Sequence, residues 1–322
     1  MTVGPSPTVR RRRLGIELRR LREAAGLTCE EVGERLEWSA SKVSRMETGR
    51  VRVHPRDVQD LLDLYDVRDD GVREGLVGVA RESRQRGWWH VFSDVLPPWF
   101  EVYVGLEAEA ESVRTFEMHV IPGLLQTEAY AQAIFRAAYR AGETGTEERR
   151  TRLRMARQEA LTREPPLRLT AVIDEAVLYR CVGGPEVMRN QMARLCEAAA
   201  LPNVTLQVLP LAAGAHPAME GAFSILEFGR PEDADVVYLE HTMGGLYLER
   251  DAEVRGYGVV FEALSAAALS PEESTALLRS VARNYGSEFG GSGEWSMPPG
   301  AGVAAAVDRE TASRSRAAEA EC

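Results

Sequence analysis

Short polar and basic side chains follow one another along a predicted helix near the N-terminus, and such groups suit contacts with base edges and phosphates. Ser39 is a good N-cap for this helix, and Val43 and Met46 share the inner face that would pack on a core. Gly49 stands where a left-handed residue commonly follows a helix. The outward side therefore carries the candidate reading groups, which are Ala40, Ser41, Lys42, Ser44 and Arg45.

The residues before this helix predict the elements that would hold it. Thr28 and Glu31 have the spacing of a capping box, and Val32 and Leu36 share one face of the helix that follows. Helix, short helix, tight turn and helix is the order in which a helix-turn-helix places one helix in the DNA major groove. We complete the predicted DNA-binding set with Thr28, Ser39, Arg50 and Arg52.

The run LRRLREAAGLTCEEVGERLEWSASKVSRMETGR resembles the XRE family, the lambda-repressor-like helix-turn-helix. The string S-x-S-x-x-S-R-x-E-x-G from Ser39 to Gly49 carries much of the resemblance. It implies base contacts from Ala40, Ser41 and Arg45, with Lys42 and Ser44 beside them. Two residues depart from the family: Cys29 replaces a common phosphate-binding glutamine, and Gly33 replaces a common alanine.

The charge distribution supports double-stranded DNA as a partner of the N-terminal part. Residues 1–56 contain 13 Lys and Arg against 7 Asp and Glu, whereas the whole chain contains 39 against 49. A positively charged N-terminal part followed by an acidic remainder is expected of a phosphate-binding module joined to a domain that does not bind DNA. The alternative is a small helical bundle whose basic face is only solvated.

Length and composition indicate two globular domains and exclude several classes of protein. At 322 residues the chain is too long for one helix-turn-helix domain. No run of about 18 apolar residues predicts a membrane span, and the basic N-terminus lacks the apolar core of a signal peptide. Four widely spaced cysteines predict neither a disulfide framework nor a zinc site, so we expect a reducing cytoplasm.

The predicted fold class is an N-terminal all-α five-helix helix-turn-helix domain, a C-terminal mixed α/β domain and a disordered C-terminal tail. The boundaries are a flexible arm over 1–9, the helix-turn-helix domain over 10–86, the α/β domain over 87–285 and the tail over 286–322. The fifth helix is expected to turn Val72, Leu76, Val79 and Ala80 inward. The aromatic segment 88–100 is predicted to be an ordered connector.

In the α/β domain, the segment 105–121 is interpreted as helix or partly extended chain. Strands are predicted in LRLTAVIDEAVL, NVTLQVLPL, AFSILEF, DVVYLEHT and GLYLE, and helices before, between and after them. Strings such as VIPGLLQTEAYA and GGPEVMRNQMARL resemble the large C-terminal domain of XRE regulators of actinomycetes, often described as antitoxin-like. That resemblance implies a small partner protein encoded by a neighbouring gene.

Catalysis is not expected, and neither a cofactor nor a metal is predicted. Asp174-Glu175 and Glu240-His241 follow predicted strands, and His119 and His216 could join them. Neighbouring side chains on a strand point to different faces, and no known catalytic or phosphate-loop motif occurs. The predicted protein is therefore a sequence-specific transcriptional regulator that binds DNA as a homodimer. A partner-binding antitoxin that regulates its own operon and a ligand-sensing regulator are the alternatives.

Overall fold

The computed structural model describes residues 7–49, 51–83, 87–137, 145–229 and 233–287. Arg50, one of the predicted DNA contacts, and nearly all of the predicted tail lie outside the described residues. The chain forms two compact units, one of residues 1–111, 226–236 and 241–245, the other of residues 112–225, 237–240 and 246–322. Among the described residues, no helix combines the length and the apolar character that crossing a membrane requires.

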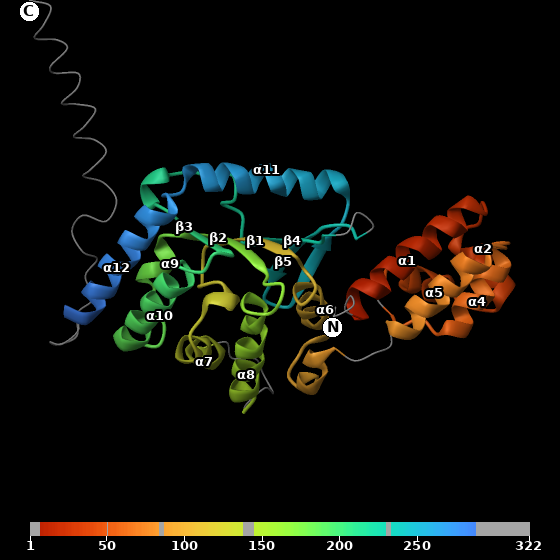
Figure 1. The fold of residues 1–322 in the computed structure, drawn as a ribbon, viewed down its shortest axis with the longest axis horizontal. Coiled ribbons are helices and arrows are strands. Elements are labelled where there is room, and N and C mark those ends of the chain that lie inside the picture. The colour runs from red at the N-terminus through yellow and green to blue at the C-terminus, as the bar shows by residue number, and fades with distance from the viewer. Residues whose placement is uncertain (1–6, 50, 84–86, 138–144, 230–232, 288–322) are drawn as a thin grey trace, which may run out of the picture. The chain divides into compact units, whose positions relative to one another are not determined.

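The first unit begins with the helical bundle drawn in red and orange in Figure 1. Its helices are α1 (Pro7–Ala24), α2 (Cys29–Leu36), α3 (Ala40–Glu47), α4 (Pro55–Leu64) and α5 (Asp70–Glu82). The bundle core contains fully buried aliphatic side chains from four of them, including Leu14, Val32, Val43 and Leu62. The expected five-helix order is confirmed, because each amphipathic segment buries its apolar stripe against the others.

One expectation about α5 is wrong. Val72 was expected to face inward, but 38% of it is exposed, while Val77 and Ala80 are the buried residues of this helix. Leu76 and Val79 are only partly buried against the core. The stripe is thus centred on Val77 and Ala80, which stand three residues apart, and Val72 lies beyond its rim.

The aromatic segment after the bundle is ordered, as predicted. It forms the 3-10 turn η1 (Trp88–Phe92) and the start of α6 (Pro98–Glu107). Trp89 is 3% exposed, and Trp88 packs edge-on against it.

The α/β part has six strands in the order β3-β2-β1-β4-β5-β6. Their bounds are β1 (Ser112–Glu117), β2 (Arg168–Asp174), β3 (Val204–Leu209), β4 (Phe223–Glu227), β5 (Val236–His241) and β6 (Gly244–Leu248). β1, β2 and β3 are parallel, with Ser112 opposite Arg168 and Leu169 opposite Val204. Parallel neighbours need crossover connections, and helices supply them here.

The helices of the second unit cover both faces of these parallel strands. In Figure 1, α11 runs along one side of β1, β2 and β3, and α7, α8 and α10 lie on the other. The remaining bounds are η2 (Gly123–Leu125), α7 (Glu128–Ala137), α8 (Glu147–Arg157), η3 (Gln158–Leu161), α9 (Ala176–Tyr179), α10 (Pro185–Ala198), η4 (Leu211–Ala213), α11 (Asp251–Ala267) and α12 (Pro271–Ser287). The core between α11 and the strands includes Phe116, Val172 and Phe261.

Candidate nucleic-acid interface

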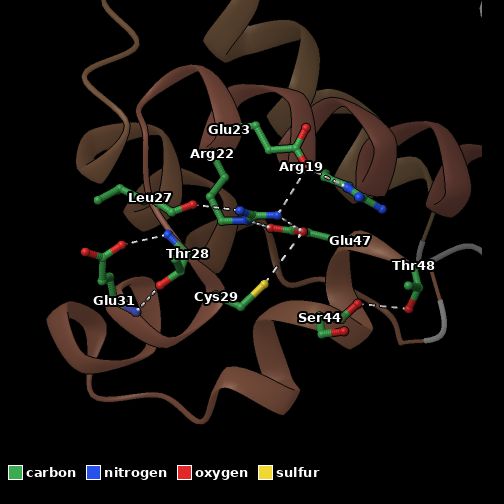
Figure 2. Close-up of polar contacts among 10 residues, drawn as sticks. All are labelled: Arg19, Arg22, Glu23, Leu27, Thr28, Cys29, Glu31, Ser44, Glu47 and Thr48. Carbon is green, nitrogen blue, oxygen red and sulfur yellow. Dashed lines mark hydrogen bonds and ion pairs between the residues drawn. The ribbon is translucent and has the colours of Figure 1, made fainter.

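The start of α2 is fixed by the predicted capping box. The Thr28 Oγ1 accepts a hydrogen bond from the Glu31 backbone N–H at 3.1 Å, and the Thr28 N–H donates to Glu31 Oε2 at 2.8 Å (Figure 2). These bonds satisfy two of the amides that a helix N-terminus leaves without partners. The backbone N–H of Thr28 also lowers the pKa of the Glu31 carboxyl below its ordinary value.

The turn between α2 and α3 brings two backbones unusually close together. Glu37 has a left-handed φ of 55°, and the Trp38 N–H donates to the Gly33 carbonyl at 2.8 Å. A Cβ atom on Gly33 would lie 2.7 Å from the Trp38 carbonyl oxygen. A glycine at this position therefore permits the close approach on which the tight turn depends.

α3 presents the side chains that the sequence predicts. Ser39 caps the helix by accepting from the Lys42 N–H at 3.1 Å, and Val43 and Met46 are each 1% exposed on the inner face. On the opposite side Ser41, Ser44 and Arg45 are exposed, and Ala40 and Lys42 are half-buried.

Two basic side chains of this helix have different surroundings. The Arg45 Nε donates to the Ser41 carbonyl at 3.1 Å, so the side chain lies back along the exposed face. The Lys42 ammonium lies 3.4 Å from the ring centroid of Trp38 and 3.3 Å from Asp57 Oδ2. Arg45 thus offers its charge on the outer face, whereas Lys42 is held by two neighbours.

The C-terminal end of α3 is anchored to α1 by an ion pair that the sequence reasoning did not find. The Arg22 Nε and Nη2 donate to Glu47 Oε1 and Oε2 at 2.6 and 3.0 Å, and Nη1 donates to the Leu27 carbonyl at 2.6 Å (Figure 2). The side chains of Arg22 and Glu47 are 11% and 6% exposed. Because 25 residues separate the partners, only the folded chain brings them together.

Cys29 contacts the same carboxylate. Its thiol donates to Glu47 Oε2 across 3.9 Å, and burial, followed by the charge of Glu47, raises the pKa of the thiol. Cys29 is therefore a neutral partner of the Arg22–Glu47 pair.

The chain leaves α3 through Gly49, whose φ of 64° confirms the predicted left-handed residue. α4 then begins at Pro55, a residue suited to the first position of a helix, and the His54 Nδ1 accepts from the Arg56 N–H at 3.2 Å. Arg52 lies exposed between the two helices.

In the α/β domain, three of the residues considered for catalysis accept hydrogen bonds within the fold. Asp174 Oδ1 accepts from the Ala176 N–H, and Glu175 accepts from the Leu211 N–H and the Tyr179 hydroxyl at 2.8 and 3.0 Å. His216 accepts from the Ala218 N–H. In the described ranges, no three His, Cys, Asp or Glu side chains gather where they could hold a metal ion.

A buried polar network, which the sequence reasoning missed, supports the loop after β1. Gln191 accepts from the Thr127 N–H at 2.7 Å and donates to the Leu125 carbonyl at 2.8 Å. Gln126 donates to the Ile121 carbonyl and accepts from Arg154 Nη1. Gln158 donates to the Gly123 and Gln126 carbonyls at 3.2 and 2.7 Å. These three glutamines in a Pro-Gly loop and its neighbouring helices were the available signal, since buried amides are used to satisfy backbone groups.

Comparisons with known families match two parts of the chain. Residues 13–75 match the model of a helix-turn-helix domain, and residues 100–280 match the model of a domain of unknown function, DUF5753. Searches of the curated proteins and of the solved structures found no match.

Proposed function

This chain belongs to the DUF5753 family and carries a helix-turn-helix domain before the family's own domain, and from this premise we propose that it is a sequence-specific DNA-binding transcriptional regulator. The second helix of the motif, α3 with its cap at Ser39, enters the major groove and reads bases. Ser41 and Arg45 are the base-reading residues, with Ala40 and Ser44 beside them, and Thr28 and Arg52 contact phosphates.

The observation that carries this proposal is the arrangement of α3. Its inner residues Val43 and Met46 are buried, its outer residues Ser41, Ser44 and Arg45 are exposed, and its two ends are fixed by Ser39 and by the Arg22–Glu47 pair. A recognition helix needs such rigid support, because base contacts depend on side chains held in register with the groove. The excess of cations in residues 1–56 favours phosphate binding by the same part of the chain.

The test is selection of duplexes from a randomised pool by the purified full chain, followed by affinity measurements on the selected duplex and on a mixed-sequence duplex. Arg45→Ala should weaken binding to the selected duplex by about 1–3 kcal/mol and relax specificity at one base pair. Arg68→Ala is the matched control, because it removes an exposed arginine paired with Asp66 in the loop before α5. It should leave both affinities unchanged.

The proposal fails if no sequence is enriched, or if the wild-type protein binds no duplex at low salt. Equal loss on both duplexes in Arg45→Ala would make Arg45 a phosphate contact and remove it from the base-reading set. We also infer a homodimer on DNA, because one such motif covers one half-site, with half-sites about 34 Å apart. A complex with the mass of one chain on the selected duplex would contradict the dimer.

For the DUF5753 domain we propose binding of a protein partner, of the kind a small neighbouring gene would encode, rather than catalysis. The support is that Asp174, Glu175 and His216, three of the groups considered for chemistry, accept hydrogen bonds from backbone N–H groups of the fold. Pull-down with the full chain from its own organism, with the product of any adjacent small gene tested first, is the experiment. A small-molecule ligand that changes the affinity of the purified protein for DNA would instead favour a ligand-sensing regulator.

A further inference from the structure

Lys42 is the single lysine of the chain, and it stands at the third position of α3. In the docking geometry of a helix-turn-helix, this end of the recognition helix faces the DNA. A lysine there is expected to neutralise a phosphate. The contacts of its ammonium in the folded chain differ from that expectation.

The ammonium lies between an aromatic ring and a carboxylate. Its Nζ is 3.4 Å from the ring centroid of Trp38 and 3.3 Å from Oδ2 of Asp57. Trp38 belongs to the turn before α3 and Asp57 to the first turn of α4, so two flanking elements hold the same cation. An ammonium over a tryptophan ring is attracted by the ring's quadrupole, and the carboxylate neutralises its charge.

This arrangement has an electrostatic consequence for a DNA-facing surface. Asp57 places a negative charge beside α3, where it repels phosphates, and it removes most of the attraction that Lys42 would exert on them. Both side chains are about one-third exposed, at 34% and 28%, so solvent and DNA can reach the pair. Arg45, in contrast, has no carboxylate partner among the described residues.

We propose that Asp57 limits the general attraction of the DNA interface for phosphates: it holds the Lys42 ammonium on Trp38 and withholds its charge from phosphates of any sequence. This inference rests on the proposed function. Charge contacts with phosphates strengthen binding to every duplex alike, whereas base contacts strengthen binding to one sequence. Lower general attraction therefore leaves a larger share of the affinity to Arg45 and its neighbours on α3.

A purely structural pair makes the opposite prediction. If Asp57 only fastened α4 to α3, its loss would loosen the recognition helix and weaken binding to every duplex. If Asp57 withholds a cation, its loss strengthens binding to DNA of unrelated sequence.

The experiment is a double-mutant cycle on the full chain with wild type, Asp57→Asn, Lys42→Gln and the double variant. Affinity is measured on the selected duplex and on a mixed-sequence duplex across a series of salt concentrations. One additional phosphate contact corresponds to about 5- to 10-fold in affinity near 0.1 M salt and to a salt slope steeper by about 1. Asp57→Asn should show both changes, to the same extent on the mixed-sequence duplex and on the selected duplex.

Lys42→Gln shows how much of the affinity depends on the lysine, with Asp57 present and with Asp57 replaced. Its effect on the affinity should be smaller when Asp57 is present than when Asp57 is replaced, where it should abolish the whole gain. Asp63→Asn is the matched control, since it removes a carboxylate of the same helix that pairs with Arg73 instead of Lys42. It should alter neither affinity nor slope. Asp57→Ser replaces Asp57→Asn if thermal melting finds that variant unfolded.

The inference is overturned if Asp57→Asn binds the mixed-sequence duplex no more tightly than wild type, or if Lys42→Gln causes the same loss in both backgrounds. If the wild type still prefers its selected duplex, either result refutes only the role of Asp57 and leaves the proposed function standing. A wild type without any preferred duplex refutes the proposed function itself.

Discussion

The guanidinium of Arg22 on α1 forms two hydrogen bonds with the carboxylate of Glu47, the last residue of α3, at 2.6 and 3.0 Å. The two side chains are nearly buried, and the Leu27 carbonyl takes a further hydrogen bond from Arg22. A bidentate pair of this kind fixes both position and rotation of the helix end. The end of α3 is therefore held to α1 by an ion pair whose loss should be costly.

Glu47→Gln should destabilise the helical bundle by about 3 kcal/mol, because the guanidinium of Arg22 would stay buried without its counter-charge. Glu17→Gln is the control, since Glu17 forms an ion pair with Arg20 on the surface of α1, where the two side chains are 31% and 62% exposed. Surface pairs of this kind contribute about 0–1 kcal/mol. Thermal unfolding of both variants compares the two effects, and equal shifts would refute the special role of the buried pair.

Gly15 is a second anchor of α3. A Cβ atom there would lie 2.4 Å from the Glu47 carbonyl oxygen and 2.7 Å from that of Met46, so α1 must move away from α3 if the glycine is replaced. Gly15→Ala should cost about 1–3 kcal/mol through this clash, despite the better helix propensity of alanine. It should also weaken binding to the selected duplex, because the end of α3 shifts.

Gly75→Ala in α5 separates the clash from the propensity. No atom lies within 4 Å of a Cβ added at Gly75, and the residue is exposed. This substitution should stabilise the bundle by up to about 1 kcal/mol. If Gly15→Ala stabilised the bundle, α1 and the end of α3 would have to be further apart than the 2.4 Å between an added Cβ and the Glu47 carbonyl oxygen implies.

The features that sequence patterns predicted correctly are local ones. The capping box of Thr28, the cap at Ser39 and the left-handed Gly49 each depend on residues within three or four positions, so type and spacing suffice to predict them. The anchors of α3 could not be found in this way. Arg22 and Glu47 are 25 residues apart, and Lys42 and Asp57 belong to different helices.

β1 illustrates a different limit. Its sequence SVRTFE belongs to the segment interpreted from the sequence as helix or partly extended chain, whereas the structure makes it a strand. The strand lies inside the sheet between β2 and β4, and both of its faces are covered, as Val113 and Phe116 are 2% and 0% exposed. A central parallel strand is buried on both faces, so its residues need not alternate between apolar and polar. A search for alternation with a period of two residues therefore does not find it.

Glu117 at the end of β1 provides a pH-dependent prediction for the α/β domain. Burial, with the charge of Glu240 acting in the same direction and Arg154 opposing, raises the pKa of its carboxyl to about 8. Between its ordinary value of 4.5 and about 8, the folded chain holds a proton that the unfolded chain releases. The contribution of Glu117 to the free energy of unfolding therefore falls as pH rises through this window, by at most about 1.4 kcal/mol per pH unit.

Glu117→Gln should remove this loss, because the amide is neutral at every pH. The variant and the wild type should have similar melting temperatures near pH 4.5, and the variant should melt higher than wild type at pH 8, with the difference growing steadily between these values. Scanning calorimetry at several pH values measures it, and the exposed Glu220→Gln is the control that should leave the wild-type profile unchanged. A Glu117→Gln profile parallel to that of wild type from pH 4.5 to 8 would mean that the carboxyl is ionised in the folded chain and that its charge is neutralised there.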